Sequence, residues 1–282
     1  MMNNIKLVEG YPLYYNGVIY LVKGYQHPQD KIIAYPRYTL LEHRKLRKYE
    51  INKYVSYVYW DCIKQIVPVI DVSHAYSFYT LFHKHIPYTS QMVKETISQL
   101  FGVNDLFITG SSLVFSTYND IDIVILGVDT ELINRVQSLI SRKIIRKAPE
   151  SCLVREYLLK HGKDTDLTTY LYLKKDTISH IIVNKIYVNI KFVSYSNGFN
   201  QCMDPVKDRK LFRGRIQVID CINKHILPTR YIVRVGNKKI LMETFREMYS
   251  EIPLGEYYVE GYIEYRETGE VLVPDHGYMF KL

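Results

Sequence analysis

Two aspartates, Asp120 and Asp122, lie two positions apart at the start of an apolar run near the middle of the chain. The residues around them are mostly β-branched, which is typical of a buried strand. Because side chains two positions apart on a strand project to the same face, we expect the two carboxylates to lie side by side. Like charges at this spacing repel each other unless a cation lies between them. Hard cations such as Mg²⁺ or Mn²⁺ bind carboxylate oxygens, so the pair predicts a divalent metal site.

A second motif, Gly110-Ser111-Ser112, follows an apolar run that begins at Leu106. Gly110 permits a tight turn after a strand, and a helical start at this point would direct backbone N–H groups toward an anion. The hydroxyls of Ser111 and Ser112 add further donors. An anion site beside a metal-binding carboxylate pair is the arrangement needed to bind a nucleoside triphosphate.

The Gly-Ser turn, the short spacer and the Asp-x-Asp strand, within residues 106–127, resemble the signature of the DNA polymerase beta-type nucleotidyltransferase superfamily. The resemblance implies that Asp120 and Asp122 hold the metal ions and that the turn binds the phosphates. A looser similarity is to archaeal proteins that carry such a domain between two flanking segments. It rests on the N-terminal residues Val22-Lys23-Gly24, His27-Pro28 and Ala34-Tyr35-Pro36-Arg37-Tyr38.

In this family a third metal-binding acid belongs on a later strand, in a pattern of apolar, acidic, apolar and basic residues. The strand predicted over residues 185–193 has Asn189 at the acidic position and Lys191 at the basic one, where Lys191 is a candidate contact for the nucleotide. An asparagine offers a neutral carbonyl oxygen but accepts no proton and supplies no charge. In a two-metal scheme the third acid serves the ion that activates the attacking hydroxyl, so chemistry is expected to be slow or absent. In an alternative alignment, a carboxylate reaches the site from the preceding segment: Asp164, Asp166 or Asp176.

These motifs predict an enzyme that transfers a nucleotidyl group from a nucleoside triphosphate to a hydroxyl acceptor on nucleic acid or protein. The alternative, favoured by Asn189, is a non-catalytic protein that keeps the fold and binds nucleotide or RNA. A purely structural subunit of a larger assembly is a third hypothesis. In a structural interpretation Asp120 closes a turn and Asp122 is an edge charge, but the flanking apolar runs argue against it.

The charge balance is basic: 37 Lys and Arg against 29 Asp and Glu give a formal net charge of +8. This excess is compatible with a polyanionic partner such as RNA or DNA, and equally with a moderately basic surface. Arg142, Lys143, Arg146 and Lys147 follow the helix predicted over residues 129–140 and are candidates for nucleic-acid contacts. A solvated helix end, where the helix dipole favours cations, explains them about as well.

The remaining composition bears on location. No run of about 18 apolar residues occurs, and the N-terminus lacks the apolar segment of a secretory signal. We therefore expect a cytoplasmic protein with no membrane partner. The cysteines have no close spacing, which excludes a zinc ribbon and predicts ordinary buried thiols rather than a disulfide framework: Cys62, Cys152, Cys202 and Cys221.

The expected fold is α+β, with a central nucleotidyltransferase-like α/β domain that contains a mixed sheet. Residues 1–60 are predicted to be a β-rich segment with a hairpin at Asn16-Gly17, and residues 61–200 the central domain. Residues 208–282 contain about five short strands, typical of a small oligonucleotide-binding (OB) barrel. Aromatic and basic side chains on one barrel face would bind single strands, and the candidates are Tyr231, Arg234, Tyr258, Tyr262 and Arg266.

Helices are predicted over residues 72–83 and 90–101, the second capped by Thr89 or Ser90 and closed by Gly102.

Overall fold

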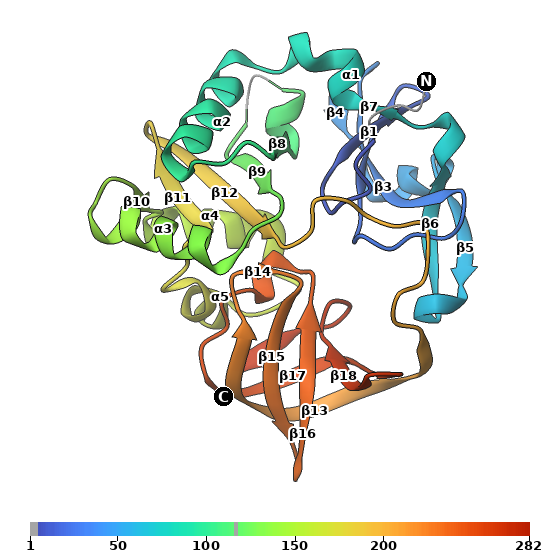
Figure 1. The fold of residues 1–282 in the computed structure, drawn as a ribbon, viewed down its shortest axis with the longest axis vertical. Helices are drawn as coiled ribbons and strands as arrows, with labels where there is room; N and C mark the ends of the chain where they lie inside the picture. Colours follow the sequence, from blue (N-terminus) through green and yellow to red (C-terminus); the bar gives the residue numbers. More distant parts are fainter. Residues whose placement is uncertain (1–4, 116–117) are drawn as a thin grey trace. The chain divides into compact units, whose positions relative to one another are not determined.

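The computed structural model describes residues 5–115 and 118–282 (Figure 1). The fold is α+β, as expected in outline, with three sheets and more strand than helix. The chain divides into two compact units. Unit 1 comprises residues 1–127 and 188–203, and unit 2 comprises residues 128–187 and 204–282. The three-part division expected from the sequence stays a prediction.

Unit 1 begins with an antiparallel sheet built on a tight hairpin. Asn16 and Gly17 have φ angles of 47° and 80°, which two-residue type I′ turns require. They join β1 (Pro12–Tyr15) to β2 (Val18–Val22), as predicted. The strand order is β5–β6–β3–β2–β1–β7, with β4 paired to β3. The other strands are β3 (Lys31–Thr39), β4 (Arg44–Lys45), β5 (Ser56–Trp60), β6 (Gln65–Asp71) and β7 (Tyr76–Ser77).

The helix predicted over residues 72–83 is wrong in extent. Tyr76–Ser77 form β7 and pair with β1, so only a short α1 (Phe78–Phe82) follows. Sheet pairing overrides the local helical pattern there. Single 3₁₀ segments surround these elements: Lys48–Lys53, Asp61–Ile63, Val72–His74 and His83–His85.

The second predicted helix is present as α2 (Tyr88–Phe101). Gly102 ends it with a φ of 67°, as expected. Its N-cap is Pro87, however, and not Thr89 or Ser90. Ser90 is fully buried, and its hydroxyl donates to the carbonyl of Ser112 at 3.0 Å. The serine therefore bonds to the Gly-Ser turn instead of capping its own helix.

Three strands carry the residues of the predicted site. β8 (Leu106–Thr109) pairs antiparallel with β9 (Ile121–Ile125), and β12 (Ile186–Val193) pairs parallel with β9. A 3₁₀ turn, Ser111–Leu113, follows β8. The β-branched residues of β9 are buried as predicted: Ile121, Ile123 and Ile125 are all fully buried.

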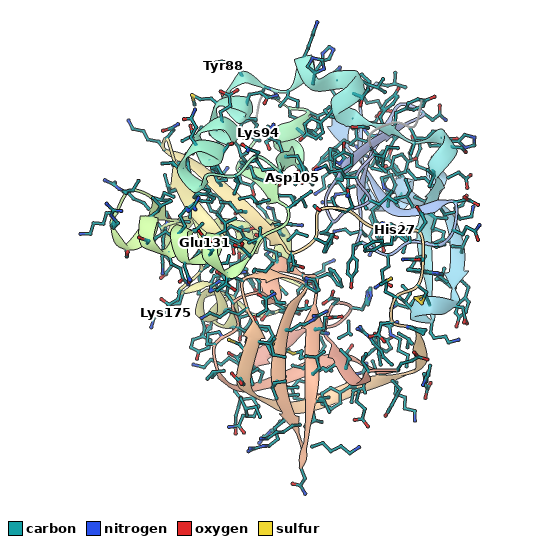
Figure 2. The ribbon with its side chains drawn as sticks, in the orientation of Figure 1. His27, Tyr88, Lys94, Asp105, Glu131 and Lys175 are labelled. Carbon is teal, nitrogen blue, oxygen red and sulfur yellow. A yellow bond between two sulfur atoms is a disulfide. The ribbon has the colours of Figure 1, made fainter. Side chains whose placement is uncertain are left out.

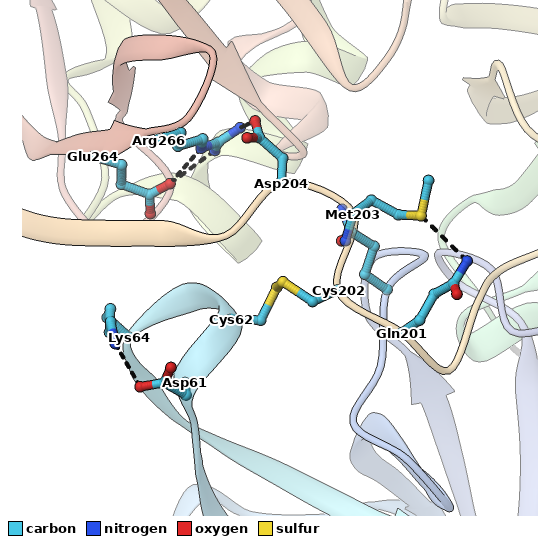
Figure 3. The surroundings of a disulfide bond; sticks show 10 residues. Asp61, Cys62, Lys64, Gln201, Cys202, Met203, Asp204, Glu264 and Arg266 are labelled. Carbon is cyan, nitrogen blue, oxygen red and sulfur yellow. Dashed lines mark hydrogen bonds and ion pairs between the residues drawn. A yellow bond between two sulfur atoms is a disulfide. The ribbon is translucent and has the colours of Figure 1, made fainter.

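The segment after β12 runs back to the N-terminal sheet within unit 1. The Phe199 N–H donates to the Tyr25 carbonyl at 2.7 Å, and the His27 N–H donates to the Phe199 carbonyl at 2.9 Å. A disulfide joins Cys62 to Cys202, which are 140 residues apart in sequence (Figure 3). This overturns the prediction of ordinary thiols at these two positions, because the tertiary fold brings together cysteines that no local spacing relates.

The other two cysteines, Cys152 and Cys221, are free and half-buried. The predicted cytoplasmic location stays a prediction.

His27, labelled in Figure 2, holds the N-terminal segment to this sheet. Its ring is fully buried, Nε2 lies 3.1 Å from the Leu7 carbonyl, and Nδ1 accepts the N–H of Ile33 at 3.2 Å. Burial lowers the pKa of His27 to about 4, so the neutral ring donates through Nε2. This histidine has a structural role in the N-terminal motif.

Unit 2 contains three helices and two groups of strands. The helix predicted over residues 129–140 is present as α3 (Thr130–Ser141), and the side chain of Asp129 caps it by accepting the N–H of Leu132 at 2.9 Å. β10 (Arg146–Lys147) pairs antiparallel with β11 (His180–Val183). The remaining helical segments are α4 (Glu150–Glu156), which continues into a π-helical turn (Tyr157–His161), and α5 (Leu167–Lys174).

The C-terminal strands of unit 2 form one sheet, drawn in orange and red in Figure 1. Pairing runs β13–β15–β16–β18–β17–β19, and β17 also pairs with β13. The β16–β18 pair is parallel and the others are antiparallel. The strands of this sheet are β13 (Val206–Asn223), β15 (Thr229–Val235), β16 (Lys238–Thr244), β17 (Gly255–Arg266), β18 (Gly269–Val273) and β19 (Met279–Lys281). The short strand β14 (Ile226–Leu227) is not part of this sheet, and a 3₁₀ turn lies at Glu247–Tyr249.

The core of unit 2 lies between this sheet and helices α4 and α5. Tyr231, Met242 and Tyr257 from the sheet pack with Leu153 and Tyr170 from the helices, and all five are buried. Over the described residues, no helix is both long enough and apolar enough to cross a membrane.

Candidate functional site

Strand register brings three polar side chains into one row across β8, β9 and β12. Asp122 on β9 pairs with Thr109 on β8 and with Asn189 on β12. Residues that pair in register project to the same face. Asp120 immediately precedes β9, two positions before Asp122. The sheet therefore gathers the Asp-x-Asp motif and the predicted third-ligand position at one place.

The amide of Asn189 connects the two carboxylates. Its Nδ2 atom donates to Asp120 Oδ2 at 2.8 Å and to Asp122 Oδ1 at 3.3 Å. Asp120 and Asn189 are 6 % and 2 % exposed, so the repulsion between the carboxylates is only weakly screened by water. The amide hydrogens carry partial positive charge and lie where a cation between two carboxylates would be expected.

Gly110 allows the turn after β8 to approach the carboxylate of Asp122. Its φ is 72°, and a Cβ atom at this position would lie only 2.0 Å from Asp122 Oδ2. Both the backbone conformation and the close contact require glycine. The predicted neighbourhood of the glycine turn and the aspartate pair is present in the structure.

The two serines of the turn differ. Ser112 is fully buried, and its hydroxyl donates to the Thr109 carbonyl at 3.3 Å. This corrects the expectation that both hydroxyls face an anion, because the Ser112 hydroxyl stabilises the turn. Ser111 is half-buried at the start of the 3₁₀ turn.

Lys191 lies two residues after Asn189 and therefore projects from the same face of β12. Its Nζ atom is 3.5 Å from Glu9 Oε1. Sequence reasoning missed Glu9, which lies far from the motifs along the chain. The only local signal is one carboxylate in the otherwise apolar run Leu7-Val8-Glu9. A buried carboxylate of this kind needs a partner, but the sequence does not identify the partner.

The donor atoms at the aspartate pair fit one hard divalent cation. Two carboxylates converge on the Asn189 Nδ2 atom, and the absence of a Cβ at Gly110 makes room for the Asp122 carboxylate. Water and phosphate oxygens ordinarily complete the coordination of Mg²⁺. In residues 5–115 and 118–282, no group of three or more acidic, histidine or cysteine side chains could hold a metal ion. Among the described residues, the ligands available to a metal ion at this site are therefore two carboxylates and one amide.

The alternative third acids lie in unit 2 and have partners there. Asp164 pairs with Arg246 at 2.6 Å, and Asp166 caps α5 by accepting the N–H of Thr169 at 2.9 Å. Asp176 lies 3.7 Å from Lys147.

The cationic cluster after α3 lies on the surface of unit 2. Lys147, which pairs with Asp176, belongs to strand β10 together with Arg146. All four side chains are exposed: Arg142, Lys143, Arg146 and Lys147. Their role in nucleic-acid binding stays a prediction.

Tyr231 is fully buried in the core of unit 2, so its predicted part in a base-stacking face is wrong. The sequence held a signal for this: Tyr231 and Arg234 are three positions apart on β15, and side chains at odd spacing project to opposite faces. Arg234 is exposed and donates to Gln217 at 3.0 Å.

The other aromatic candidates are half-buried on β17. The ring of Tyr258 stacks on that of Tyr278, and the Arg209 guanidinium lies 3.6 Å from the centre of the Tyr262 ring. Arg266 is held in ion pairs with Glu243 and Glu264.

Comparisons of this chain with protein-family models, curated proteins and solved structures found no match.

Proposed function

We propose that unit 1 binds a nucleoside triphosphate with Mg²⁺ or Mn²⁺ and transfers its nucleotidyl group to a hydroxyl acceptor, as DNA polymerase beta-type nucleotidyltransferases do. The convergence of Asp120 and Asp122 beside Gly110 carries the proposal. The order of elements agrees with it: α2, β8, the glycine turn and β9 follow one another, and the later strand β12 pairs parallel with β9.

In this proposal Asp120 and Asp122 hold the metal ion. The Asn189 amide, which now donates to both carboxylates, would turn over on metal binding and offer its carbonyl oxygen as a neutral third donor. When bound, the ion would neutralise phosphate charge and favour attack by the acceptor hydroxyl. Because Gly110 has no Cβ, the turn lies against the Asp122 carboxylate, so phosphates bound to the ion would lie beside this turn. Asp120 or Asp122 would also accept the hydroxyl proton, because the Asn189 amide cannot.

The second candidate function is binding of nucleotide or RNA without transfer. One observation favours it: the Asn189 amide donates to both aspartates and so satisfies the pair without any metal ion. An asparagine also removes the charge and the basic oxygen that a second ion would need.

We further propose that the C-terminal sheet is an OB-like barrel that binds single-stranded RNA or DNA. The return pairing of β17 with β13 and the parallel β16–β18 pair support this topology. β15 and β17 flank β13, and Arg234, Tyr258 and Tyr262 are exposed or half-buried on them. Aromatic rings and cations on adjacent strands suit base stacking and phosphate contact.

The test is transfer of label from α-labelled nucleoside triphosphates, with Mg²⁺, to a pool of RNA or to the protein itself. We expect transfer by the full chain and none by Asp122→Asn. The matched control is Asp71→Asn, which alters an exposed carboxylate paired with Lys31 at 2.8 Å. Magnesium-dependent binding without transfer would support the second function. Neither binding nor transfer would favour a structural subunit.

A further inference from the structure

The outer face of the C-terminal sheet carries a row made of one cation and two aromatic rings. Arg215 on β13 pairs with Tyr258 on β17, and Tyr258 pairs with Phe280 on β19. Residues that pair in register project to the same face. The chain neighbours Tyr257 and Met279 are fully buried in the core of unit 2. The row therefore faces away from that core, because side-chain direction alternates along a strand.

Tyr278 extends this row into an aromatic platform, which we define as Tyr258, Tyr278 and Phe280. The ring of Tyr278 stacks on that of Tyr258, with 6.3 Å between the ring centres and 15° between the planes, and its centre lies 5.0 Å from that of Phe280. All three side chains are half-buried. Tyr262 lies on the same face of β17, but the Arg209 guanidinium is 3.6 Å from the centre of its ring and covers one side of it.

Cations lie in the next row on this face. Arg234 on β15 pairs with Lys239 on β16 and with Gln217 on β13. Gln217 is two positions after Arg215 and so shares its face. Arg215, Arg234 and Lys239 are exposed. Arg234 donates to Gln217 at 3.0 Å, whereas Arg215 and Lys239 make no ion pair or side-chain hydrogen bond with any residue that the structure describes.

The strand neighbours of these cations do not neutralise them. In register, Arg215 faces an aromatic ring, and Arg234 faces an amide and a lysine. Like charges directly opposite each other destabilise a sheet, so folding does not account for the Arg234–Lys239 pair. The carboxylate of the two rows is Glu256, which is exposed and pairs with Gln217. A polyanion supplies the negative charge that this arrangement lacks.

We propose that a single strand of RNA or DNA crosses this face, with its phosphates on Arg215, Arg234 and Lys239 and its bases stacked on the platform. This inference rests on the proposed binding of nucleic acid by the C-terminal sheet, and not on nucleotidyl transfer. It identifies β13, β17 and β19 as the strands that carry the bases. Stacking requires an unpaired base whose ring face is open, so the site selects single strands over duplexes.

The test of the platform measures dissociation constants of the full chain, by fluorescence anisotropy, for a labelled single strand of about twelve nucleotides and for its duplex. Phe280→Leu keeps an apolar side chain but removes the ring, and it should weaken single-strand binding about fivefold or more. Phe280→Tyr keeps the ring and should stay within about twofold of the wild type. The matched control is Tyr59→Leu, which removes a tyrosine of unit 1 that is 60 % exposed and should not change binding.

The test of the cations repeats these measurements at several salt concentrations. Arg215→Ala should weaken binding and lower the slope of log Kd against log salt concentration by about 0.7, the value for one phosphate contact on a single strand. Phe280→Leu should leave the slope unchanged. Glu256→Gln should tighten binding, because it removes the carboxylate of the two rows. The control Lys31→Ala makes the same change of charge in unit 1, where Lys31 is paired with Asp71, and should leave the slope unchanged.

Wild-type affinity in Phe280→Leu, or duplex binding as tight as single-strand binding, would overturn this inference while leaving the proposed binding of nucleic acid intact. A wild-type chain that binds no single strand would overturn both. Thermal unfolding of each variant shows whether a loss of affinity reflects a loss of fold. Tyr278→Leu, just before β19, removes a second ring of the platform and should give the same loss if Phe280→Leu proves unstable.

Discussion

Replacing Asn189 by aspartate tests the geometry on which the site depends. The Asn189 amide nitrogen lies 2.8 Å from Asp120 and 3.3 Å from Asp122, so Asn189→Asp would put a third carboxylate oxygen at a similar distance from both. At an effective dielectric constant of about 20, each repulsion would reach about 5 kcal/mol. The carboxyl group would take up a proton instead, because raising its pKa from about 4 to 7 costs only about 4 kcal/mol at pH 7.

We therefore expect Asn189→Asp to lower the free energy of unfolding by about 3–4 kcal/mol at pH 7 in the presence of a chelator. The pKa of the new group is raised in the folded state, so this loss should disappear as the pH falls toward 4. A divalent ion that binds the three carboxylates should also reverse it, in proportion to ion concentration. If the second carboxylate-bound ion is what the wild type lacks, transferase activity should rise as well.

Urea unfolding of Asn189→Asp at pH 7 and pH 5, with Mg²⁺ or with chelator, measures these effects. The matched control is Asn237→Asp, which makes the same chemical change at an exposed turn and should behave like the wild type. The reasoning is refuted if Asn189→Asp is as stable as the wild type in chelator at pH 7 and gains nothing from Mg²⁺. That result would mean that the three side chains do not share one space.

Three further predictions concern single features. Gly110→Ala should lower the free energy of unfolding by about 3 kcal/mol or more and abolish nucleotide binding, because its Cβ would lie 2.0 Å from a carboxylate oxygen. The control Gly127→Ala is also at positive φ but has nothing within 4 Å, and it should lower the free energy of unfolding by only about 1 kcal/mol. Reducing the Cys62–Cys202 disulfide, which spans 140 residues, should lower the free energy of unfolding by up to about 5 kcal/mol, measured with and without reductant. Burial raises the pKa of Glu251, but hydrogen bonds from His225 and Ile178 and the positive charge of Lys174 outweigh burial and lower it to about 2. Its stabilisation, about 3 kcal/mol, should be lost as the pH falls from about 4.5 to 2, and denaturant titrations of the wild type and of Glu251→Gln should differ in this range.

Local sequence determined those elements whose signals are local. Asn16-Gly17 specified the first hairpin because only a few residue types accept two successive positive φ angles. Asp129 and Gly102 marked helix ends because capping depends on neighbouring residues alone. The Asp-x-Asp spacing also indicated that the two carboxylates share a face, since side-chain direction alternates along a strand.

Only the tertiary structure decided which distant residues complete the site. The Asn189 amide, the Gly110 turn and the Glu9 carboxylate come from separate parts of the chain, and strand register and the packing of the N-terminal segment bring them together. The same holds for the Cys62–Cys202 pair. The sequence alone shows which groups need partners, because a buried charge or a residue with positive φ destabilises the folded protein at any position. It does not say which partner satisfies them, because that depends on contacts between residues far apart in the chain.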